Sequence, residues 1–138
     1  MRVLLTIVMS CLCAARLHAE VVAVSSGVAV KDIDIERVTN ILLGRVTTWA
    51  DGSPVIVIVS MEASADQAVS ELLGRDTDRL LRGWKRLVYA GSGAMPTVAR
   101  SNAEAVGMVA HLAGALVVLP INVPAPGCRI IELHPATR

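Results

Sequence analysis

Two clusters of serine and glycine, and one arginine, are the residues of this sequence best suited to hold a small anion. Ser25, Ser26 and Gly27 follow an apolar run, and a Gly-Ser-Gly cluster occupies residues 91–93. Backbone N–H groups in such turns form concave nests for oxyanions, and glycine lets the backbone approach the ligand closely. Arg86 supplies a guanidinium whose planar fork matches phosphate oxygens. Plainer roles suit the same residues: a polar turn, a helix end and a solvated helix face, respectively.

Other chemistry finds little support in the residue types and their spacing. The sequence contains no G-x-S-x-G elbow, no P-loop and no H-E-x-x-H pair. His111 and His134 have no companion ligand at a spacing typical of a metal site. Cys128 has no evident catalytic partner and suits the role of a small buried hydrophobe. We therefore expect no enzyme, no metal and no cofactor, and the net charge of +1 argues against nucleic-acid binding.

Alternating strand and helix patterns predict the framework for these residues. Continuous β-branched and apolar runs indicate buried strands, and apolar positions at helical spacing indicate amphipathic helices. The predicted strands are 20–25, 55–59, 115–119 and 129–133, the last at a sheet edge, and the predicted helices are 35–43, 65–73, 77–90 and 102–111. This order favours an α/β fold with a mixed, mostly parallel sheet and helices on both faces. One domain, residues 20–138, accounts for the whole pattern.

Polar residues ahead of the helical patterns predict where each helix begins. Asp34, Asp76 and Ser101 each stand at an expected N-cap. Ser64 has Gln67 three residues later, which is the spacing of a capping box. The sequence therefore predicts that Ser64 caps the helix that follows it.

The aromatic side chains have a structural explanation as well. Trp49, Trp84 and Tyr89 fit roles in the core or at its rim. No anion-binding role is therefore needed to explain them.

Residues 1–19 have the proportions of a secretory signal peptide. An apolar run over 3–15 follows a positive start and is too short for a membrane span, which needs about 20 residues. Cleavage after Ala19 is expected, with Ala15 as the second choice; acylation at Cys11 and a buried first element are the other readings. Removal of this leader takes away two arginines and leaves 11 basic and 12 acidic residues. The remaining chain is expected to be periplasmic or secreted, with no membrane span.

Four segments of the chain, taken in order, carry a resemblance to one protein family. They are 41–45 (ILLGR), 48–52 (TWADG), 83–93 (GWKRLVYAGSG) and 113–118 (AGALVV). The chain resembles the short proteins of the phosphate ABC transporter substrate-binding-protein-like family, of the type II periplasmic binding protein class. The resemblance implies a single lobe of that fold, whereas full-length members have two lobes and bind an oxyanion between them.

The resemblance also implies a site at the start of the helix after the second strand. The family's anion loop has glycine where this chain has Ala63 and Ala65, and threonine where it has Asp66; Glu62 and Ser64 match. Ser64 is thereby implied as a ligand for an oxyanion, against its reading as a helix cap. A carboxylate at Asp66 opposes binding, since two unit charges about 4 Å apart repel by roughly 4 kcal/mol at an effective dielectric of about 20.

Two functions follow from these observations. The first is an exported solute-binding-type domain for phosphate or a similar oxyanion, with Ser25, Ser26, Gly27, Ser64 and Arg86 as ligand-binding residues. One lobe supplies half a cleft, so tight binding would require a homodimer or a second protein. The alternative is a periplasmic accessory module that keeps the fold, has lost the ligand and acts through a partner protein.

Overall fold

The computed structural model describes residues 20–25, 27–28, 33–91 and 93–133. The predicted leader and Ser26 lie outside these ranges. Signal cleavage and any role of Ser26 therefore remain predictions from the sequence.

A five-stranded sheet in the order β3-β2-β4-β1-β5 forms the middle of the molecule. The strands are β1 (Glu20–Ser25), β2 (Ile56–Ser60), β3 (Thr97–Ala99), β4 (Ala115–Pro120) and β5 (Cys128–Glu132). β2 pairs in parallel with β3 and β4, whereas β1 runs antiparallel to β4 and β5. Of these five strands, four point one way and β1 opposes them, which confirms the predicted mixed, mostly parallel sheet.

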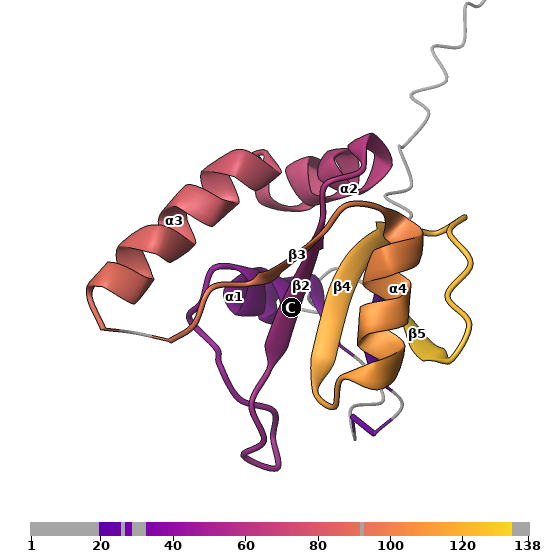
Figure 1. Ribbon diagram of the computed structural model, residues 1–138, viewed down its shortest axis with the longest axis horizontal. Coiled ribbons are helices and arrows are strands. Elements are labelled where there is room, and N and C mark those ends of the chain that lie inside the picture. The colour runs from indigo at the N-terminus through magenta and orange to yellow at the C-terminus, as the bar shows by residue number, and fades with distance from the viewer. Residues whose placement is uncertain (1–19, 26, 29–32, 92, 134–138) are drawn as a thin grey trace, which may run out of the picture.

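Helices cover both faces of this sheet, as the sequence predicts (Figure 1). The helices are α1 (Ile35–Leu42), α2 (Ala63–Leu73), α3 (Thr77–Tyr89) and α4 (Asn102–His111). α1, α2 and α3 contribute leucine, isoleucine, valine and tryptophan side chains to one core. α4 packs on the opposite face over a core rich in alanine, including Ala23, Ala99, Ala105 and Ala115. The two helix layers thus enclose β1, β2 and β4, which are the buried strands of the sheet.

Side-chain caps fix three of the helix starts at their predicted positions. Asp34 accepts a hydrogen bond from the N–H of Arg37 at 2.7 Å, and Asp76 accepts from Arg79 at 2.9 Å. Ser101 accepts from the N–H of Glu104 at 3.1 Å. Each bond satisfies one of the amides that a helix leaves unpaired in its first turn.

The capping box predicted at Ser64 is wrong. α2 begins at Ala63, so Glu62 is the N-cap residue, and its side chain makes no capping bond to α2. Ser64 is the second residue of the helix and bonds elsewhere. The sequence prediction also omits β3, because a three-residue edge strand with two exposed side chains has no apolar run to reveal it.

Two tryptophans of the family-like segments hold the fold together. The indole N–H of Trp49 donates to the carbonyl of Gly114 at 3.0 Å, and that of Trp84 donates to the carbonyl of Leu42 at 2.7 Å. Both rings are buried, which confirms their predicted packing role, whereas Tyr89 is 91% exposed and the same prediction for it is wrong. The segments that carry the family resemblance therefore contain two tryptophans that pack in the core and bond to distant backbone carbonyls.

Candidate functional site

The carboxyl ends of β2 and β3 form the candidate site. These neighbouring parallel strands lead into helices on opposite faces of the sheet, α2 after β2 and α4 after β3. Ligands of open α/β sheets bind where consecutive connections diverge in this way. We call this place between the starts of α2 and α4 the crevice. The amino ends of α2 and α4 both face this crevice, and helix amino ends favour anions.

Hydrogen bonds between the chain's own side chains bridge this crevice. Asn102, the first residue of α4, is 6% exposed. Its side-chain carbonyl accepts from the Ser60 hydroxyl at 2.8 Å, and its side-chain amide donates to Ser64 Oγ at 2.9 Å. The hydroxyl that the resemblance implies as a ligand is therefore a hydrogen-bond acceptor within the protein.

Glu62 supplies an anion to the amino end of α4. Its carboxylate accepts the backbone N–H of Asn102 at 2.7 Å, and its own N–H donates to Ser60 Oγ at 3.3 Å. Together with the Ser101 cap, this carboxylate satisfies two amides of the first turn of α4. An external oxyanion would compete with it for the Asn102 amide.

Asp66 is also committed to a structural contact. Its carboxylate accepts the backbone N–H of Thr77, the first residue of α3, at 2.9 Å. This bond holds the pKa of Asp66 below its ordinary value of 3.8. Asp66 lies in the first turn of α2, as predicted, and the helix that it caps is α3.

Ser25 and Gly27 lie at the opposite end of the sheet from Ser64. Ser25 ends β1, which runs against β4, and pairs with Cys128 at the start of β5. Val24 pairs with Leu116, which itself pairs with Val57 near the start of β2. Ser25 is buried and Gly27 is exposed. The structure therefore does not bring this predicted nest together with Ser64.

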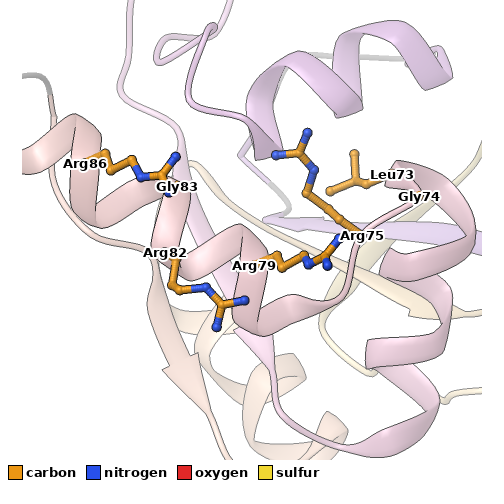
Figure 2. Close-up of a pocket in the computed structure, with 7 residues that line it drawn as sticks. All are labelled: Leu73, Gly74, Arg75, Arg79, Arg82, Gly83 and Arg86. Atoms are coloured by element: carbon orange, nitrogen blue, oxygen red, sulfur yellow. The ribbon is translucent and has the colours of Figure 1, made fainter.

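Arg86 belongs to a third location, on the outer face of α3. It lines a hollow of about 440 Å³ together with Leu73, Gly74, Arg75, Arg79, Arg82 and Gly83. Figure 2 shows Arg79, Arg82 and Arg86 projecting from α3, and Arg75 from the segment before it. The predicted ligand-binding residues that the structure describes thus fall into three separate places.

Sequence reasoning missed Asn102 and Ser60, and it assigned Glu62 no partner. The pairing of Ser60 with Asn102 spans 42 residues and depends on how β2 and α4 meet. The only local signal is a polar Asn102 directly after an N-cap serine, at a position where α4 has its buried face.

The Cys128 thiol is hydrogen-bonded within the protein. Sγ of Cys128 donates to the carbonyl of Val106 at 3.4 Å, and partial burial raises the pKa of this thiol above its ordinary value of 9.0. A raised pKa leaves little reactive thiolate near neutral pH. Among the described residues, no three His, Cys, Asp or Glu side chains converge on a metal position. No helix in that part of the chain is long and apolar enough to cross a membrane.

Solved structures with the same architecture are substrate-binding proteins of phosphate transport. A protein from Clostridium perfringens, described as a phosphate ABC transporter substrate-binding protein with bound phosphate, matches 83% of this chain with a TM-score of 0.64 and 12% identity. A phosphate transport receptor from Vibrio cholerae matches 86% with a TM-score of 0.57 and 17% identity. PstS from Borrelia burgdorferi matches 87% with a TM-score of 0.58 and 13% identity.

These matches establish the fold. The chain covers 44%, 47% and 49% of the three proteins, respectively, so it spans about half of their length. No protein-family model and no curated protein sequence matches the chain.

Proposed function

We propose that this chain is an exported interaction module that keeps the solute-binding fold and fills the anion position with its own Glu62. The bond of 2.7 Å between the Glu62 carboxylate and the Asn102 amide carries this proposal. A free phosphate at the same place would have to displace a carboxylate that is already hydrogen-bonded. The surrounding structure supports the same conclusion in two further ways.

The side-chain amide of Asn102, a donor that could otherwise hold an oxyanion, is committed to Ser64. Ser64 is bonded to Asn102, and Asp66 adds a negative charge one helical turn after Glu62. The hydrogen-bonded network at the crevice contains no basic side chain; its members are Ser60, Glu62, Ser64 and Asn102. An oxyanion bound there would meet two carboxylates, and none of these four residues would supply a compensating cation.

The proposal also includes a partner for this module. The chain spans about half of the length of each phosphate-binding neighbour. We infer that this partner is a protein of the same compartment, reached after signal cleavage.

Titration of the purified, processed protein with orthophosphate tests this function. A ligand that binds only the folded state raises the melting temperature in proportion to its concentration relative to Kd. We expect no rise up to millimolar orthophosphate, and we expect crosslinking in the periplasm to recover a partner whose yield is unchanged in Asp66→Thr. A monomer without a partner that carries a copurified ligand would contradict the proposal.

Phosphate binding at Ser64 is the second candidate, favoured by one observation. Ala63 and Ser64 are exposed at the amino end of α2, an 11-residue helix. This candidate requires a melting-temperature rise with orthophosphate that Ser64→Ala abolishes. It also requires that the rise persist in Arg79→Gln/Arg86→Gln, because those arginines line a different surface.

A further inference from the structure

The arginine groove on α3 is a surface that neither the crevice nor the two cores explain. We use this name for the hollow of about 440 Å³ lined by Arg75, Arg79, Arg82, Arg86, Gly74, Gly83 and Leu73 (Figure 2). All four arginines are exposed. Within the described part of the chain, none of the four guanidinium groups is paired with a carboxylate.

This concentration of charge stands out against a nearly neutral chain. The whole sequence has 13 basic and 12 acidic residues, and four of the basic ones line this single hollow. Asp76 and Asp78 belong to the same segment, but neither lines the groove. Asp76 faces the backbone of Arg79, where it caps α3. The groove therefore presents several guanidinium groups that are available to an anion.

The helix geometry places two of these arginines in line. Seven residues separate Arg79 from Arg86, which corresponds to about 10 Å along the helix axis and a rotation of only about 20°. Gly83 lies between them on the same face. The groove is therefore elongated along α3, with a guanidinium at each end and no side chain at the middle.

Gly83 has no packing requirement that explains it. A Cβ added there would meet no atom within 4 Å, and its φ is outside the positive range that favours glycine. Glycine inside a helix costs roughly 1 kcal/mol relative to alanine. Its effect at this position is to keep the floor of the groove open between Arg79 and Arg86.

We propose that the arginine groove binds a small, linear oligophosphate anion. Arginine forks form short, charge-assisted and often bidentate bonds with phosphate oxygens, and a row of them matches a chain of phosphoryl groups. Leu73 is the one apolar side chain of the lining and no aromatic side chain belongs to it, whereas the buried centre of a protein interface is largely apolar and enriched in aromatic residues as well as arginine. The composition therefore favours a compact polyanion in solution over a protein surface. This proposal does not depend on the function proposed for the crevice.

Isothermal titration of the processed protein with tripolyphosphate tests the groove. We expect binding that is stronger than that of orthophosphate and that weakens at least about tenfold in Arg79→Gln/Arg86→Gln, since each lost charge-assisted bond is worth about that factor or more. Lys85→Gln/Arg100→Gln is the matched control, because it removes the same charge from exposed residues outside the groove and should change affinity little. Far-UV circular dichroism and melting temperature check that each variant is folded.

Two further variants distinguish a specific binding site from nonspecific electrostatic attraction of the anion. Arg79→Lys/Arg86→Lys keeps the positive charge and removes the planar guanidinium groups. Gly83→Leu keeps every charge and fills the open middle of the groove with a side chain. Both variants should weaken tripolyphosphate binding. Equal losses in the groove variant and the charge-matched control would overturn the proposal. Equal affinity for orthophosphate and tripolyphosphate would overturn it too, as would binding to anionic phosphatidylglycerol vesicles without binding to tripolyphosphate.

Discussion

At the scale of single residues, Asp66 shows how one carboxylate can connect two helices. It belongs to α2 and accepts the first amide of α3, while Asp76 accepts the third. The connection between these helices is short, so two carboxylates at the start of α3 fix the direction in which α3 leaves α2. Arg75 and the arginines of α3 then share one surface.

Replacing Asp66 by asparagine should destabilise the protein by about 1 kcal/mol, because a capping carboxylate becomes a neutral and weaker acceptor. The measurement is urea unfolding followed by circular dichroism. The lowered pKa of Asp66 means that its contribution is fully present above the ordinary value of 3.8 and is lost as the pH falls through the lower folded value.

Asp66→Asn should therefore differ from wild type at pH 7 and should approach it in strongly acidic buffer. Glu132→Gln is a suitable control, because it removes the same charge from an exposed residue of the edge strand β5. A stability difference for Asp66→Asn that is independent of pH would contradict this role of the carboxylate.

At the scale of elements, the turn before β4 is one of the most constrained parts of the described chain. Gly114 has φ +81°, and a Cβ there would lie 2.4 Å from the carbonyl oxygen of Pro54. The same residue accepts the indole of Trp49 through its carbonyl. The turn around Trp49 and Pro54 thus closes directly over the entry to β4.

Gly114→Ala should destabilise the protein by roughly 2 kcal/mol or more, since it combines a strained φ with a backbone clash. Gly52→Ala is a matched control, because it has a similar φ of +85° and open space around its Cβ. Chemical denaturation should show a clearly larger loss for Gly114→Ala. Equal losses would mean that conformational strain alone, and not the contact with Pro54, limits this position.

Local patterns predicted most of the elements and much less of the site. α4 and β1 have the predicted bounds, because an N-cap serine and a buried β-branched run are signals within a few residues. The crevice depends on contacts between Ser60, Glu62 and Asn102 that are about 40 residues apart in sequence. No periodicity in the sequence indicates such contacts. The sequence therefore predicted the position of the loop, but the predicted capping role of Ser64 in it was wrong.

At the scale of the whole molecule, the chain spans about half of the length of the phosphate-binding proteins that share its fold. The structural matches cover 83–87% of this chain and 44–49% of the neighbouring proteins. Export and a partner are the two features that the proposed function adds to this fold. The leader is the feature that can be measured most directly.

Expression of the full chain in a bacterial host should release a processed form into the periplasm. Its amino terminus, read by intact-protein mass spectrometry, should be Glu20, or Arg16 if the second cleavage position is used. Replacing Val8 by arginine should interrupt the apolar run and keep the precursor in the cytoplasm. An unprocessed periplasmic chain, or a lipid-modified one beginning at Cys11, would contradict the predicted leader.

The antiparallel strand β1 imposes an order on the folding of the chain. β1 comes first among the described elements, yet its partners β4 and β5 come last, so the sheet cannot close until the chain has been made nearly to its end. Pairing over such a separation requires closure of a long loop and makes folding slow. A chain that crosses a membrane amino end first therefore lacks a closed sheet while it is being transferred. A chain cut after residue 114 would retain β1 without either of its neighbours, β4 and β5.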